Sequence, residues 1–125
     1  MIKDDLTYRV IGCAMQVHRD LGPGFQELIY QRSLAIELEQ AEINFIREQE
    51  QLIYYRGITV GTRRADFVIE EQLVLEIKAR TQLENAHLAQ AKNYTVIYDF
   101  PKGLLINFGG QSLEYKLLFN PKYNK

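Results

Sequence analysis

Apolar residues recur at steps of three and four along the first third of the chain, a spacing that places them on one face of a helix. This pattern predicts one helix over residues 6–21 and a second over residues 25–40. The segment Gly22-Pro23-Gly24 separates them, because glycine favours the left-handed conformation that caps a helix and proline cannot continue one. Two helices joined by a tight turn are therefore expected.

After residue 42 the pattern changes to short runs of β-branched and aromatic residues, which are typical of strands. The runs over residues 43–78 predict a β-meander, and helical spacing returns over residues 83–98. Two last strands are expected on either side of Gly109-Gly110. The predicted order is ααββββαββ, with no repeat and no linker. It indicates one α+β domain over residues 1–125, with a β-sheet flanked by helices.

Composition limits the classes of function. The chain has 15 Lys and Arg residues against 16 Asp and Glu residues, so its net charge of -1 excludes the broadly basic surface of a protein that coats DNA, and any contact with nucleic acid must be local. The single cysteine, Cys13, excludes an internal disulfide and a cysteine-built zinc site, and favours a cytoplasmic location. No apolar run approaches the ~20 residues that span a bilayer, and the start lacks the layout of a signal peptide, so no membrane partner is expected.

Two acidic residues are the first candidates for chemistry. Alternation along residues 73–78 places Glu76 and Lys78 on one face of an apolar strand, and a short turn can bring Asp66 beside Glu76 on an antiparallel neighbour. Two carboxylates this close repel unless one is protonated or a cation lies between them, and Mg²⁺ usually binds one or two carboxylates. The structural alternatives are an ion pair between Glu76 and Lys78 at the strand end, and a bend-ending role for Asp66.

Further polar residues occupy the predicted helices. Gln90 and Tyr94 form a polar stripe with His87 that can face a substrate, although an ordinary solvated face is an alternative, above all for His87. Glu27 stands in the first turn of the second helix, where the helix dipole favours a carboxylate. It also heads a partly apolar face, where a carboxylate needs a cation or hydrogen-bond donors, so a role near the metal stays open.

Taken together, these motifs resemble the GxxExxY protein family, a branch of the PD-(D/E)xK nuclease superfamily. Gly24, Glu27 and Tyr30 match the motif for which the family is named. The superfamily's acidic residue, its E-x-K triplet and the Q-x-x-x-Y motif of RecB-like nucleases are similar, in this order, to Asp66, Glu76-Ile77-Lys78 and residues 90–94. The chain departs from the superfamily pattern at Ala65, where the motif's name has proline. The resemblance extends over residues 8–119.

This resemblance implies a restriction-endonuclease-like core and a hydrolase that cleaves phosphodiester bonds in DNA or RNA. It implies a site for Mg²⁺ or Mn²⁺ made by Asp66 and Glu76, with the carbonyl of Ile77 as a third ligand and Lys78 activating or orienting the attacking water. Glu27 and Gln90 would contribute to the same site, and Tyr94 would contact a phosphate or a base. The expected nucleic-acid contact is a local basic patch of Arg63, Arg64, Lys78, Arg80 and Lys92.

Two readings from other classes remain. The first is a module that binds nucleic acid or protein on a nuclease-like fold without cleaving. The second is an oligomerising domain, for which the eight tyrosines can supply an interface between copies.

Overall fold

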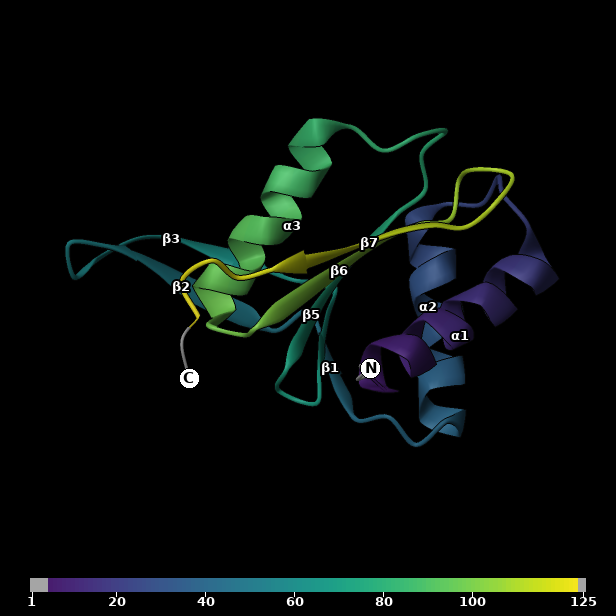
Figure 1. Ribbon diagram of the computed structural model, residues 1–125, viewed down its shortest axis with the longest axis horizontal. Helices are drawn as coiled ribbons and strands as arrows, with labels where there is room; N and C mark the ends of the chain where they lie inside the picture. The colour runs from purple at the N-terminus through teal and green to yellow at the C-terminus, as the bar shows by residue number, and fades with distance from the viewer. Residues whose placement is uncertain (1–4, 124–125) are drawn as a thin grey trace.

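The computed structural model describes residues 5–123. The helices in this part of the chain are α1 (Asp5–Leu21), α2 (Glu27–Gln40) and α3 (Asn85–Tyr98). The strands are β1 (Phe45–Arg47), β2 (Glu50–Tyr55), β3 (Ile58–Arg64), β4 (Phe67–Ile69), β5 (Leu73–Lys78), β6 (Lys102–Asn107) and β7 (Glu114–Phe119). Figure 1 shows α3 on one side of the main sheet and the pair α1 and α2 on the other.

The predicted helical hairpin is confirmed. Gly22 ends α1 with a φ of 69°, and its N–H donates to the His18 carbonyl at 2.8 Å. This left-handed residue supplies the cap that the sequence indicates. Helix α2 begins at Glu27, two residues later than expected. Among the described residues, no helix is long and apolar enough to cross a membrane.

A mixed five-stranded sheet forms the centre of the fold, in the order β1-β4-β5-β6-β7. Strands β5 and β6 are parallel, and the other pairs are antiparallel. Parallel neighbours need a long crossover connection, which α3 provides between β5 and β6. The expected α+β architecture, with a mixed sheet flanked by helices, is confirmed.

The predicted meander and the number of strands before α3 are wrong. Five strands, not four, precede α3 in the part of the chain that the structure describes. β2 and β3 form a separate two-stranded sheet, and β1 pairs with β4 across this insertion. The chain leaves the hairpin at Ala65, whose N–H donates to the Tyr98 hydroxyl at 3.0 Å instead of a strand partner. Alternation of side chains cannot reveal this arrangement, because it shows which face a residue occupies but not which strand lies beside it.

The two faces of β5 pack against different layers, as its alternation predicts. Leu73, Leu75 and Ile77 belong to the core under α1 and α2. Val74 packs in a smaller cluster with Tyr94 of α3. Because alternate residues share a face, Glu76 lies on the α3 side, one position beyond this smaller cluster.

Candidate metal centre

Asp66 and Glu76 are brought side by side at one end of the β4–β5 pair. Phe67 pairs with Leu75 in this antiparallel ladder, so the next position outward sets Asp66 opposite Glu76. The Asp66 N–H donates to Glu76 Oε2 at 2.9 Å, and the Ile77 N–H donates to Asp66 Oδ2 at 2.7 Å. Each carboxylate is therefore held by the backbone of the other's strand. The predicted adjacency of the two acidic residues is present in the structure.

The electrostatics of the pair follow from its burial. The Glu76 side chain is buried, and desolvation is the main cause that raises the pKa of both carboxyl groups. At Glu76 the charge of Asp66 raises the pKa further. The charge of Glu27 also raises the pKa of both groups, and the Lys78 ammonium lowers both. The charges of Glu27 and Lys78 therefore act on the pair, in opposite directions.

The donor chemistry of the pair fits a divalent cation with oxygen ligands. Each carboxylate uses one oxygen to accept a backbone N–H, and the second oxygen accepts in none of the hydrogen bonds found between residues 5 and 123. Across those same residues, no group of three or more His, Cys, Asp or Glu side chains is arranged to hold a metal ion. The pair thus resembles a Mg²⁺ site in which one or two carboxylates bind and water fills the remaining positions. The ligand role of the Ile77 carbonyl stays a prediction.

The turn between α1 and α2 positions Glu27. The Tyr30 hydroxyl donates to the Gly22 carbonyl at 2.6 Å and accepts the Phe25 N–H at 3.1 Å, so it closes the turn from inside. Its fully buried ring stacks on Phe108, with centroids 4.7 Å apart and planes 13° from parallel. Of the three residues in the G-x-x-E-x-x-Y pattern, Tyr30 is thus structural, and it fixes the turn from which α2 begins at Glu27.

Replacing Tyr30 by phenylalanine tests this role. The variant keeps the ring stack but leaves the Gly22 carbonyl and the Phe25 N–H without their partner. We expect a loss of about 1–3 kcal/mol in the free energy of unfolding, measured by denaturant titration. The matched control is Tyr54→Phe on the exposed strand β2, expected to change stability by about 0.5 kcal/mol or less. Equal stability of Tyr30→Phe and the unaltered protein would contradict the proposed role.

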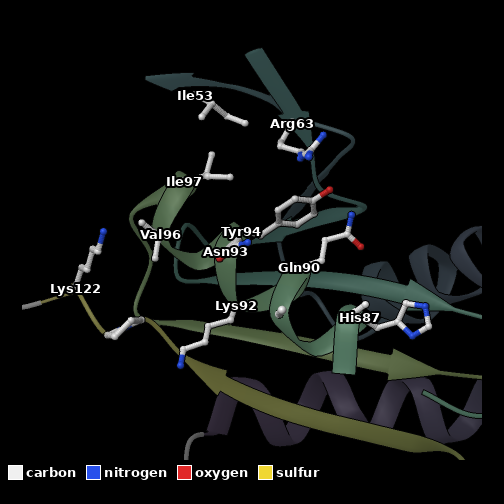
Figure 2. Close-up of a pocket in the computed structure, with 13 residues that line it drawn as sticks. Ile53, Arg63, His87, Gln90, Lys92, Asn93, Tyr94, Val96, Ile97 and Lys122 are labelled. Carbon is white, nitrogen blue, oxygen red and sulfur yellow. The ribbon is translucent and has the colours of Figure 1, made fainter. Parts of the chain in front are cut away.

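Helix α3 and the β2–β3 hairpin line an open cavity of about 800 Å³, and neither Asp66 nor Glu76 is among its lining residues. Gln90 and Tyr94 line it from α3, and Ile53 and Arg63 line it from the hairpin. Figure 2 shows the Tyr94 ring pointing toward Arg63. The pKa of Tyr94 is raised to about 12, first by burial and then by the charge of Glu76, while Arg63 lowers it. Tyr94 therefore lines the cavity and also feels the charge of the carboxylate pair.

Parts of the predicted polar stripe are corrected. Tyr94 is buried, with 6% of its surface exposed, so the alternative of an ordinary solvated face is wrong for this residue. His87 is also buried and has a structural role, since its Nδ1 accepts the Glu84 N–H at 3.0 Å in a capping box at the start of α3. Gln90 is exposed at the cavity. His87, Gln90 and Tyr94 all line the cavity, and contact of Gln90 and Tyr94 with a substrate stays a prediction.

The predicted basic patch is not one continuous surface. Arg63 and Lys92 line the same cavity. Arg64 follows Arg63 in β3 and so points to the other face of the hairpin, where its guanidinium lies 3.8 Å from the Glu48 carboxylate. The cavity therefore concentrates only part of the predicted positive charge.

Sequence reasoning did not single out Asn107, which supports the end of β5. This residue is fully buried; its Oδ1 accepts the Arg80 N–H and its Nδ2 donates to the Arg80 carbonyl, both at 2.8 Å. The Phe108 N–H donates to the Lys78 carbonyl at 2.8 Å. Together these bonds fix the backbone on which Lys78 stands. The available signal was the amide of Asn107 directly after the apolar residues of β6. A polar side chain buried at such a position requires hydrogen-bond partners, which indicates a structural role.

The arrangement of two carboxylates and a lysine at the end of a sheet flanked by helices defines a restriction-endonuclease-like α+β protein. The family model of the PD-(D/E)XK nuclease superfamily matches residues 4–117, and the chain belongs to this superfamily. The crystal structure of SSO0001 has a similar fold, with a TM-score of 0.62 and 24% sequence identity. The similarity covers 74% of this chain and 49% of that chain, so the protein spans about half the length of this relative. A comparison with curated proteins gives no match.

Proposed function

We propose that this protein is a nuclease of the GxxExxY type that uses Mg²⁺ or Mn²⁺ to hydrolyse phosphodiester bonds in DNA or RNA, with residues 1–125 acting as one domain. The observation that carries the proposal is the pair of buried carboxylates, Asp66 and Glu76, each held by the other's strand and both within the field of Lys78. Burying two like charges together is costly, and a cation between them removes that cost.

Asp66 and Glu76, with the Ile77 carbonyl, would hold the metal ion. When bound, the ion neutralises charge on the scissile phosphate and lowers the pKa of the attacking water. The Lys78 ammonium, on the same strand face as Glu76, orients this water or holds a phosphate oxygen. Glu27, whose charge acts on both carboxylates, would contribute to the same site.

The remaining residues of the proposed site contact the substrate. Tyr94 and Gln90 line the cavity between α3 and the hairpin, where Arg63 and Lys92 supply positive charge. Since the whole chain has a net charge of -1, the affinity for nucleic acid rests on this local charge and falls steeply with added salt. Cys13 is a free thiol, and the cytoplasmic location inferred from the single cysteine stays a prediction.

The experiment is a gel assay with labelled single-stranded and duplex DNA and RNA. We expect cleavage of at least one substrate with Mg²⁺ or Mn²⁺, and none when a chelator is added in excess. Cleavage that resists the chelator would contradict the proposed metal dependence. Binding without cleavage under every metal condition would favour the non-cleaving module instead.

A further inference from the structure

The β2–β3 hairpin carries apolar side chains that the rest of the described chain does not cover. It extends away from the main sheet beyond α3 (Figure 1). Three large side chains near its tip are mostly exposed: Tyr54 at 57%, Tyr55 at 62% and Ile58 at 68%. Large apolar side chains clustered on a projecting element mark an interaction surface.

The register of the hairpin separates these side chains into two faces. Gln51 pairs with Arg63, Ile53 with Gly61, and Tyr55 with Ile58, and directly paired residues share a face. Ile53 and Arg63 line the cavity beside α3, as Figure 2 shows. The register shifts between Ile53 and Tyr54, where the pairing skips Val60, so the extra residue of this bulge lies in β3. Strand β2 keeps its alternation, which puts Tyr55 on that same face and Tyr54 on the opposite one. We call Arg63, Ile53, Tyr55 and Ile58 the hairpin track; it runs from the cavity to the hairpin tip.

The direction of the hairpin is set by α3. The Tyr98 hydroxyl donates to the Gln49 carbonyl before β2 and accepts the Ala65 N–H at 3.0 Å after β3, so one side chain holds both ends of the hairpin. Asp66 follows Ala65 directly. The base of the hairpin track is thus tied to the backbone that presents the carboxylate pair, and a chain lying on the track leads to the metal centre.

The chemistry of the track suits a nucleic acid with exposed base faces. Arg63 at the base of the track and Arg56 near its tip supply positive charge that complements phosphate, while Arg64 lies beside Glu48 on the other face. The Arg56 guanidinium lies 5.5 Å from the centre of the Tyr55 ring, so a cation and an aromatic surface occur together near the tip. Exposed aromatic rings beside positive charge bind single strands by stacking on bases, which are inaccessible inside a duplex.

We propose that the hairpin track binds unpaired nucleotides of the substrate, with a base stacked on Tyr55 and a phosphate contacted by Arg63. This inference rests on the proposed function, which makes the ligand a nucleic acid. It adds that the nucleic acid leading into the site is single-stranded. The alternative occupant of the same surface is a second copy of this chain.

The test uses two tryptophan substitutions, since the chain contains no tryptophan. The variants Tyr55→Trp and Tyr54→Trp place one fluorophore on each face of the hairpin. Each is titrated with an oligothymidylate at low salt and with a chelator present, so that no cleavage occurs. We expect strong quenching at position 55 and little at position 54, and little at either position with a duplex of equal length.

Alanine substitutions measure the contribution to affinity. Tyr55→Ala is expected to weaken binding of the oligothymidylate about tenfold, and Tyr54→Ala less than about twofold. Equal effects of the two variants, or no binding by the unaltered protein, would overturn the inference. Sedimentation that shows a dimer dissociated by Tyr55→Ala would also overturn it and assign the track to a second copy.

The outcomes distinguish a failure of the hairpin track from a failure of the proposed nuclease function. Metal-dependent cleavage together with equal quenching at both positions would leave the proposed function standing and remove the hairpin track. Quenching at position 55 without cleavage under any metal condition would support the track and reject the nuclease.

Discussion

Replacing either carboxylate of the metal centre is expected to abolish metal-dependent cleavage. Asp66→Asn and Glu76→Gln should each lower the initial rate at saturating Mn²⁺ by roughly 10²- to 10³-fold, the loss seen when one charge-stabilising group is removed from an active site. Both changes keep the size of the side chain, and an amide oxygen can still accept the backbone N–H that each carboxylate accepts now. The loss should therefore come from metal binding, with folding retained.

Glu71→Gln is the matched control, because Glu71 is exposed in the turn between β4 and β5, at the opposite end of this strand pair from Asp66 and Glu76. Its rate should equal that of the unaltered protein. If the two centre variants fold and retain the unaltered rate, the carboxylate pair is not the catalytic centre.

Mn²⁺ is expected to stabilise the folded protein even without substrate. An ion that binds only the native state adds about 2.7 kcal/mol at a hundredfold excess over its Kd, which corresponds to several degrees in Tm for a domain of this size. Glu76→Gln should abolish this shift. At mildly alkaline pH it should also raise the metal-free Tm, because it removes a buried charge that Asp66 repels. Thermal unfolding with and without Mn²⁺ measures both effects.

The same measurement has a pH dependence with a definite sign. Burial raises the pKa of Asp66 and Glu76, so the folded metal-free protein binds more protons than the unfolded chain above the ordinary carboxyl pKa of about 4. The free energy of unfolding of the metal-free protein therefore falls as the pH rises from about 4 toward the raised pKa values of the two groups. This fall should be smaller in Glu76→Gln, which has lost one of the two titrating groups. A metal-free variant that melts lower than the unaltered protein would instead indicate a structural ion pair between Glu76 and Lys78.

Local pattern predicted most elements because each signal lies within a few residues. The steps of three and four indicated α1 and α2, and Gly22 marked the end of the first helix through its capping conformation. The strand β5 has the predicted bounds, 73–78. Alternation along it also separated Glu76 from the core under α1 and α2. The juxtaposition of Asp66 and Glu76 followed from a short turn between two strands, which leaves few possible registers.

Pairings between distant segments were not accessible in this way. The partner of β1 is β4, on the far side of an inserted hairpin, and no feature of either strand's own residues encodes that choice. The burial of Tyr94 and the structural role of His87 also depend on where α3 docks, because a helix presents the same stripe whether a neighbour covers it or not.

The sequence by itself determined the helices, the main strands and the residue types of a two-carboxylate site, because hydrophobic periodicity and short turns act locally. Only the tertiary structure decided that Tyr30 closes the turn that presents Glu27, that Asn107 supports the strand end at Lys78, and that Tyr98 ties the hairpin to the metal centre. These contacts join segments that are adjacent only after the sheet and helices have packed. Their hydrogen-bonding partners are backbone groups, which every sequence contains and which no motif distinguishes.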